Sequence, residues 1–226
     1  MHSKLIFKSG KIFGLGLALL VAALVQPNGD AMAASKTTDG HSVEQSQANN
    51  DIYNGYFEDD QIKARSLSDW ENDWQSVYPL LVEGTLDPVL AQKAEKGDKG
   101  IEEYRAYYET GYKTDVERIV IDGDSVSFYR DGKPTEAHYQ SDGHEVLTYK
   151  KGNRGVRYIF KKVGGDESAP LFIQFSDHGI APTKAAHYHL YWGNDRAALL
   201  EQLTNWPTYY PSSLSGNDVV HEMMAH

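Results

Sequence analysis

The chain has 226 residues, contains no cysteine and carries a formal net charge of −10 at pH 7. An acidic surface of this kind argues against nucleic acid as a partner, and a chain without cysteine forms neither disulfides nor thiolate metal sites. Any transition-metal site must therefore be built from imidazole and carboxylate side chains.

The first 33 residues have the pattern of a secretory signal peptide. Three lysines precede an apolar stretch from Leu15 to Val25, and Ala31-Met32-Ala33 supplies the small-x-small pattern of a cleavage site. The apolar stretch is too short for a membrane span, and polar sequence follows it. We therefore expect residues 1–33 to be removed and the mature protein to lie in the periplasm without membrane insertion. Because no Cys follows the cleavage site, we expect no lipid anchor.

The region after the predicted cleavage site divides into a polar tail and a segment long enough for one domain. Residues 34–50 consist mainly of small polar and charged residues, so we expect a disordered tail. Residues 51–226 fall within the usual size range of a single domain.

The first part of this domain, residues 58–112, has the apolar spacing and the end signals of helices. Ser68 and Glu71 form a capping-box pattern, and Gly84 follows the apolar residues as a stop. Asp87-Pro88 indicates the start of a further helix. We predict three helices, over about 68–81, 87–96 and 101–108.

Beyond Gly111 the apolar residues alternate with polar ones, which indicates β-strands. We expect residues 113–194 to form an antiparallel barrel or sandwich. Closure into a barrel is favoured because it removes exposed strand edges, and it would leave an interior for a ligand. The strands are predicted as a hairpin around the turn 122–124, followed by 145–149, 156–163, 170–177 and 187–192.

The C-terminal residues 195–226 return to helical patterning. Asn194 or Asp195 is predicted to cap a helix that ends near Leu203, and Asn217 to cap a last helix through His226. The expected fold is therefore mainly β, with helical parts before and after the barrel.

Three histidines lie within twelve residues near the end of the predicted barrel: His178, His187 and His189. Residues two apart on a strand point to the same face, so His187 and His189 can direct both imidazoles at one ion. The connection 179–186 can return the chain antiparallel and bring His178 beside them. Three imidazoles match the tetrahedral coordination of zinc and leave its fourth position open.

Other polar residues make weaker candidates. An HxH pair alone also occurs by chance on an exposed strand, and the third histidine is what favours a site. Asp177 could orient an imidazole, although neighbouring strand residues point to opposite faces and a surface role is favoured. His221 and His226 are five residues apart, which is a poor spacing for a helical chelate. The isolated histidines are His41, His138 and His144.

Several longer motifs carry a family resemblance. They are LSDWENDWQSVYPLL, GYKTDVERI, LTYKKGNRGVRYIF, FSDHGIAP followed by HYH, and NWPTYYPSSLS. From about Gly55 onward the chain resembles the ZinT (YodA) family of bacterial periplasmic zinc-binding proteins. The resemblance implies a calycin-type, lipocalin-like β-barrel with a helical part, and a zinc ion held at the barrel mouth by residues matching His178, His187 and His189.

The resemblance also implies a role. Proteins of this family capture scarce zinc in the periplasm and cooperate with ZnuA, the binding component of a zinc ABC importer. This chain departs from some members in two ways, since its tail offers only His41 where they have a His-rich stretch, and it lacks the cysteines for their disulfide. We therefore expect no extra metal loading through the tail.

Two other functions remain open at this point. A zinc hydrolase would also use three histidines and an open coordination position, but no general base is evident near the cluster, so we expect no enzymatic activity. A lipocalin-like carrier would hold a small apolar ligand inside the barrel. Cadmium, copper or nickel can occupy the same nitrogens as zinc.

Overall fold

The computed structural model describes residues 47–201 and 204–225. The predicted signal peptide, 1–33, and most of the predicted tail lie outside these ranges. Residues 47–50 are not part of a disordered tail, because they are helical together with residues 51–53. None of the helices in the described ranges has the length and apolar character needed to cross a membrane.

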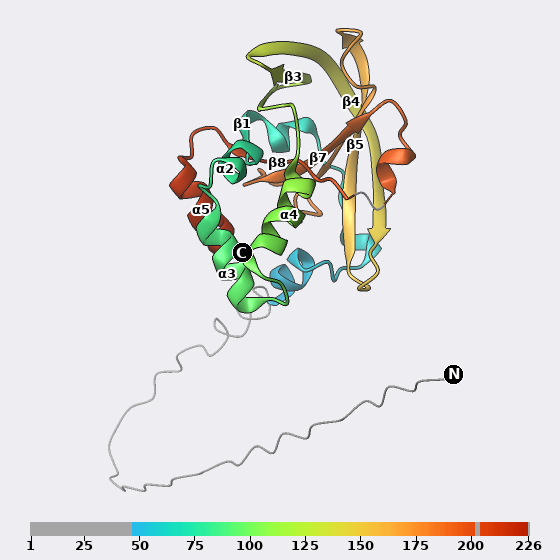
Figure 1. The fold of residues 1–226 in the computed structure, drawn as a ribbon. Helices are drawn as coiled ribbons and strands as arrows, with labels where there is room; N and C mark the ends of the chain where they lie inside the picture. Colours follow the sequence, from blue (N-terminus) through green and yellow to red (C-terminus); the bar gives the residue numbers. More distant parts are fainter. Residues whose placement is uncertain (1–46, 202–203, 226) are drawn as a thin grey trace, which may run out of the picture. The chain divides into compact units, whose positions relative to one another are not determined.

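Eight antiparallel strands form a closed barrel, which confirms the predicted fold class (Figure 1). Each strand pairs with the next along the chain, and the first pairs with the last, so that no edge is left exposed. The strands are β1 (Asn72–Ser76), β2 (Arg118–Asp122), β3 (Ser125–Arg130), β4 (Lys133–Thr148), β5 (Arg154–Gly165), β6 (Phe172–Ser176), β7 (Tyr188–Gly193) and β8 (Thr208–Pro211).

The barrel begins inside the segment that was predicted to be helical, so the boundaries 58–112 and 113–194 are wrong. The predicted helix over 68–81 consists of a 3-10 turn, η2 (Leu67–Trp70), then β1, then a short helix, α2 (Tyr78–Val82). Trp70 and Trp74 are four residues apart, as on a helix face, but both are buried in the barrel core, and the Trp74 indole donates to the Trp70 carbonyl at 2.7 Å. Pairing of β1 with β2 and β8 overrides the local helical pattern.

The C-terminal boundary is also corrected, because β8 lies within the predicted helical part 195–226. The helix expected to end near Leu203 is described only as the 3-10 turn η3 (Ala198–Leu200), whose first amide groups donate to the Asp195 carboxylate. The last helix is α5 (Gly216–Ala225), and Ser215 rather than Asn217 forms its N-terminal cap through reciprocal hydrogen bonds with Asp218.

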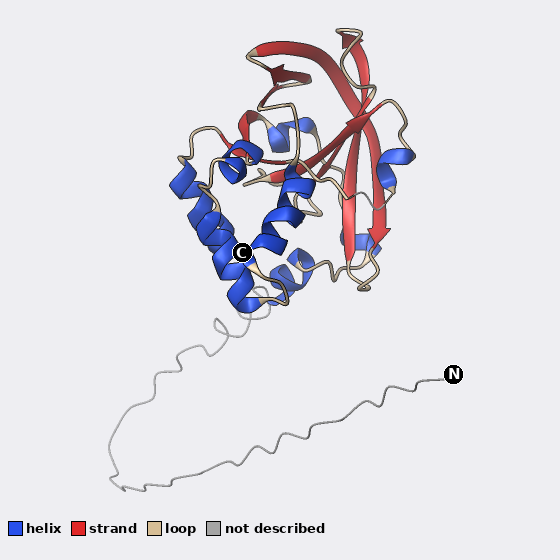
Figure 2. Ribbon diagram, in the orientation of Figure 1, coloured by secondary structure: helices blue, strands red, loops and turns tan. Residues whose placement is uncertain are grey.

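The predicted helices at 87–96 and 101–108 are confirmed as α3 (Asp87–Lys96) and α4 (Ile101–Tyr112). Figure 2 shows α2 to α5 gathered on one side of the barrel. Their apolar faces form a second core, in which Tyr210 of β8 packs with residues of α3, α4 and α5. The outer face of β8 therefore looks toward the helical layer.

The barrel interior is filled by the protein's own side chains. The largest of them are at most 2% exposed: Trp70, Trp74, Phe128, Tyr139, Tyr158, Phe160, Phe175, Tyr188 and Tyr209. Their packing is typical of small barrels whose interior serves as the core. The expectation that closure would leave an interior for a ligand is therefore wrong for this barrel.

Candidate metal centre

The three predicted histidines lie together in a nearly equilateral triangle. Ring centroids are 6.1 Å apart for His178 and His187, 6.4 Å for His178 and His189, and 6.3 Å for His187 and His189. The loop 179–186 returns the chain antiparallel from β6 to β7, as the spacing predicts.

The triangle lies at one end of the barrel, on the outer face of its wall. Tyr188 and Leu190 of β7 point into the barrel core, so the alternating residues His187 and His189 face outward. His178 lies two residues after the end of β6 and has a left-handed backbone conformation, with φ of 65°. A non-glycine residue is uncommon in that conformation, and it often marks a functional site.

Hydrogen bonds to Nδ1 orient two of the three rings. His178 Nδ1 lies 3.1 Å from the carbonyl oxygen of Tyr53, and His189 Nδ1 lies 2.8 Å from Oγ1 of Thr208. The Thr208 hydroxyl donates its own hydrogen to the Trp206 carbonyl, so it accepts from His189. Both rings thus carry their proton on Nδ1 and present the Nε2 lone pair, which is the arrangement that metal-binding histidines commonly have.

Aromatic rings hold two of the imidazoles in place. The Tyr53 ring stacks on His178 with centroids 4.4 Å apart, and the Tyr210 ring stacks on His187 at 5.0 Å with only 10° between the planes. Stacking of this kind restricts ring rotation without using a nitrogen. The rings of His178 and His187 are therefore restrained by stacking as well as by their other contacts.

The electrostatic environment keeps His189 neutral. Burial, together with the neighbouring His187 and His178, lowers the pKa of His189 to about 3. A neutral imidazole is the form that binds metal. In the folded protein, His189 therefore does not need to lose a proton before it binds a metal ion.

The rings are slightly too far apart to share one ion as they stand. Three imidazoles bound to a tetrahedral zinc at Zn–N distances of about 2.0–2.1 Å would have ring centroids about 5 Å apart, which is about 1 Å closer than here. In agreement, no set of three His, Asp or Glu side chains in the described ranges is already arranged to hold an ion. Metal binding would have to draw the rings together.

A buried ion-pair network fixes the loop between His178 and His187. Arg65 binds Asp69 at 2.7 Å and Asp177 at 2.6 Å, and its guanidinium also donates to the carbonyl of Thr183 at 2.9 Å. The side chain of Arg65 is fully buried and stacks over Trp70. Asp177 has neither of the roles considered for it, since it is buried and pairs with Arg65 rather than with an imidazole.

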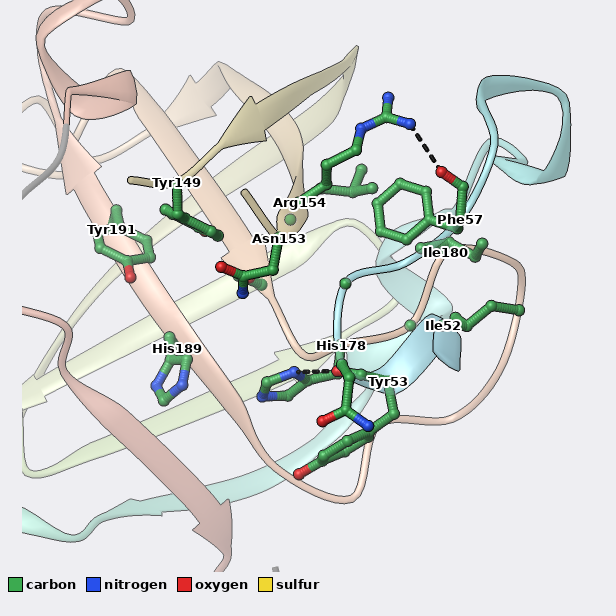
Figure 3. A pocket seen from close by; sticks show the side chains of 16 residues that line it. Ile52, Tyr53, Phe57, Tyr149, Asn153, Arg154, His178, Ile180, His189 and Tyr191 are labelled. Atoms are coloured by element: carbon green, nitrogen blue, oxygen red, sulfur yellow. Dashed lines mark hydrogen bonds between the residues drawn. The ribbon is translucent and has the colours of Figure 1, made fainter. Parts of the chain in front are cut away.

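Two hollows border the triangle. The first, of about 300 Å³, lies between residues 52–57, the start of β5 and the end of β6, and both His178 and His189 face it (Figure 3). The second, also of about 300 Å³, is lined by all three histidines and by aromatic side chains of the helical layer, including Tyr107, Tyr112 and Trp206. Neither hollow is lined by a carboxylate from the described residues.

The other histidines lie away from this centre. His138 contacts Asp124 at the hairpin turn, and His144 lies beside Tyr158. His221 is exposed on α5, whereas His41 and His226 lie outside the described residues.

A sequence model described as "ZinT (YodA) periplasmic lipocalin-like zinc-recruitment" matches residues 48–226, which is more than half of the chain. The chain belongs to the ZinT (YodA) family. The resemblance of its motifs to that family is thereby confirmed.

Individual relatives of this ZinT family member carry metal-binding descriptions. "Probable metal-binding protein YrpE" of Bacillus subtilis is 61% identical over 176 residues, which cover 77% of this chain and 70% of the relative. "Zinc-binding lipoprotein AdcA" of Streptococcus pneumoniae is 42% identical over 208 residues, which cover 90% of this chain but 42% of the relative. The chain thus spans less than half the length of AdcA.

A solved structure of the same fold contains zinc. The Zn(II)-bound ZinT-like domain of Streptococcus pneumoniae AdcA is 46% identical, with a TM-score of 0.74 over 76% of this chain and 97% of that one. Zn(II)-bound AdcA itself gives a TM-score of 0.75 at 47% identity, over 77% of this chain and 38% of that one. These relatives are described as binding proteins, and no catalytic activity is indicated for them.

Three residues with a role at the centre escaped the sequence analysis: Tyr53, Arg65 and Thr208. Tyr53 and Thr208 orient imidazoles, and Arg65 anchors the loop. Tyr53 lies 125 positions from its histidine, and nothing in the local sequence pairs them. For Thr208, the sequence offered one indication of a role, which is its position after Trp206-Pro207 in the motif NWPTYYPSSLS.

Proposed function

We propose that this protein captures zinc in the periplasm with His178, His187 and His189 and passes it to a ZnuA-type subunit of a zinc ABC importer. The observation that carries the proposal is the triangle itself, in which two rings are oriented through Nδ1 so that Nε2 remains for a metal. The family description and the zinc-bound relatives support zinc as the cargo. Cadmium, copper and nickel would bind the same nitrogens.

The surroundings of the triangle favour binding over catalysis. A hydrolytic zinc site needs a base to accept a proton from water, and the described lining of both hollows offers no carboxylate. Glu145 of β4 does not serve as such a base, because its carboxylate accepts a hydrogen bond from Arg196 at 3.0 Å.

The packed barrel interior disfavours the alternative of an apolar-ligand carrier. Such a ligand would have to displace side chains including Trp74, Phe128 and Tyr188, all at most 1% exposed. Truncation of buried aromatic residues typically costs about 3–5 kcal/mol each, so room for a ligand is expensive to create. The hollows beside the histidines lie outside this core.

Delivery to a partner is supported by the architecture of a relative. In AdcA, a ZinT-like domain forms part of a longer zinc-binding protein, whereas this chain spans less than half of that length. A separate zinc-binding subunit would supply here what the rest of that longer chain supplies there. The ZnuA-type subunit and the periplasmic location both belong to the proposal.

Calorimetric titration of the metal-stripped mature protein with zinc tests the ligand set. Wild type should bind one zinc, and His178→Ala, His187→Ala and His189→Ala should each weaken binding by more than about a hundredfold, since loss of an outer-shell partner alone costs 10–100-fold. His221→Ala, on the exposed face of α5, is the control and should bind as wild type does. Undiminished binding by any two of the three ligand variants would overturn the assignment.

A transfer assay tests the role. Zinc-loaded protein is mixed with the metal-free ZnuA-type subunit, and the rate of zinc movement is compared with the rate of spontaneous release to an excess of chelator. Transfer faster than spontaneous release supports hand-over through contact. Equal rates would show that the protein only stores zinc.

A further inference from the structure

The helix over 47–53 ends in a motif that directs one carbonyl group at the metal centre. The Tyr56 amide donates to the Asp51 carbonyl at 2.8 Å, and the Gly55 amide donates to the Ile52 carbonyl at 3.0 Å. This is the Schellman pattern, in which a residue of left-handed conformation, here Gly55 with φ of 87°, ends the helix. The Tyr53 carbonyl is one of the last carbonyls of the helix, which have no partner within the helix itself.

Tyr53 uses both its backbone and its side chain on His178. Its carbonyl oxygen lies 3.1 Å from His178 Nδ1, and its ring stacks on the imidazole with centroids 4.4 Å apart (Figure 3). His178 is the most exposed of the three histidines and lies at the end of a strand rather than within one. Its orientation therefore depends on a segment from the other end of the domain.

That segment is clamped to the first residue of β5. We call residues 50–57 the strap. The Arg154 amide donates to the Gly55 carbonyl at 2.9 Å, and the Arg154 guanidinium donates to the Phe57 carbonyl at 2.7 Å while lying over the Phe57 ring. Arg154 also pairs with Asp59 just beyond the strap.

Gly55 is the closest point of the clamp. A Cβ atom at this position would lie 2.4 Å from the Arg154 carbonyl oxygen and 2.8 Å from its amide nitrogen, which are backbone atoms that cannot rotate away. Any side chain here must push the strap off β5. The contact between the strap and β5 therefore requires glycine at position 55.

We propose that the strap is the positioning element of the zinc site, so that lifting it from β5 frees His178 and speeds the release of zinc. This inference rests on the proposed role of His178 as a ligand. The strap is accessible from outside, with Tyr56 61% exposed. An acceptor protein that displaced the strap would loosen one of three ligands and leave in place the other two, His187 just before β7 and His189 within it.

A pair of glycine variants separates displacement of the strap from backbone strain. Gly55→Ala combines a left-handed conformation with the collision against Arg154. Gly143→Ala places the same side chain at φ of 88° in β4, where nothing lies within 4 Å. We expect the zinc Kd of Gly55→Ala to rise about tenfold or more, with faster zinc release to a chelator, and that of Gly143→Ala to stay within about twofold of wild type. Equal Kd values for Gly55→Ala and wild type would overturn the proposal.

Tyr53 provides a second test that does not depend on how Gly55→Ala folds. Tyr53→Ala removes the stacked ring and should raise the Kd about two- to tenfold, whereas Tyr53→Phe keeps the ring and should restore wild-type binding. In a His178→Ala background, Tyr53→Ala should have no further effect, because Tyr53 acts through His178. Additive effects of Tyr53→Ala and His178→Ala would contradict the strap's role while leaving the ligand set intact. Unchanged zinc binding by His178→Ala would instead contradict the proposed function, and the strap's role with it.

Discussion

The hydroxyl of Thr208 accepts a hydrogen bond from Nδ1 of His189 at 2.8 Å and passes its own hydrogen to the Trp206 carbonyl at 2.9 Å. The two residues stand opposite each other in the β7–β8 pair. A single contact between paired strands of the barrel therefore sets both the tautomer and the direction of the His189 imidazole. The residues that orient a metal ligand commonly matter almost as much as the ligand.

Replacing Thr208 with Val keeps the shape of the side chain and removes the hydrogen bond. We expect Thr208→Val to weaken zinc binding about ten- to a hundredfold, because His189 loses the partner that holds its proton on Nδ1. Thr208→Ser keeps the hydroxyl and should bind zinc nearly as wild type does. Competition with a fluorescent zinc chelator measures both, and equal affinities for the Val and Ser variants would show that the hydroxyl has no such role.

The ion pairs of Arg65 should stabilise the fold strongly. Arg65→Met leaves Asp69 and Asp177 without their buried partner, and breaking a buried pair in this way costs about 3–5 kcal/mol in free energy of unfolding. Urea unfolding of the zinc-free protein measures the loss. The control is Arg118→Met, whose partner Asp73 is partly exposed, and its expected cost is much smaller because solvent screens an exposed ion pair. Similar losses for the two variants would contradict this account of Arg65.

The stability of the zinc-free protein should fall as the pH drops below the ordinary range of histidine. His189 in the unfolded chain takes up a proton near pH 6.5, but burial keeps the folded-state pKa at about 3. Between these two pH values His189 is protonated only in the unfolded state. The free energy of unfolding therefore falls by up to about 1.4 kcal/mol for each pH unit by which the pH drops. The contribution of His189 to the stability of the folded protein is therefore fully present above pH 6.5 and is lost progressively below it.

A variant without the titrating group checks this origin. His189→Gln should show a flatter dependence of unfolding free energy on pH between about 6.5 and 5, which is the upper part of the window between the two pKa values. Chemical unfolding at several pH values within the window gives the two slopes. If the unfolding free energies of wild type and His189→Gln change equally with pH, the pH dependence comes from other residues.

The proximity of His178, His187 and His189, the histidine triad, could be predicted from sequence because its geometry is local. His187 and His189 share a face by the two-residue period of a strand, and a loop of eight residues is short enough to bring His178 alongside. The same two-residue alternation of apolar and polar residues predicted most of the strands after Gly111. The family resemblance then agreed with the cluster that spacing had already selected.

The contacts that orient the triad could not be predicted in this way. Tyr53 reaches His178 across 125 positions, and Arg65 reaches Asp177 across 112. Strand β1 was missed because Trp70 and Trp74 fit a helical spacing, and only pairing with β2 and β8 makes the segment a strand. Strand β8 is four residues long and follows a proline, so it leaves little periodicity to detect.

The most direct test of the central claim is zinc K-edge X-ray absorption on the protein loaded with one equivalent of zinc. We predict scattering from three imidazole rings, with Zn–N distances of about 2.0–2.1 Å, and a loss of one ring's contribution in each of His178→Ala, His187→Ala and His189→Ala. A wild-type spectrum with fewer than three imidazoles, or one left unchanged by these substitutions, would contradict the account.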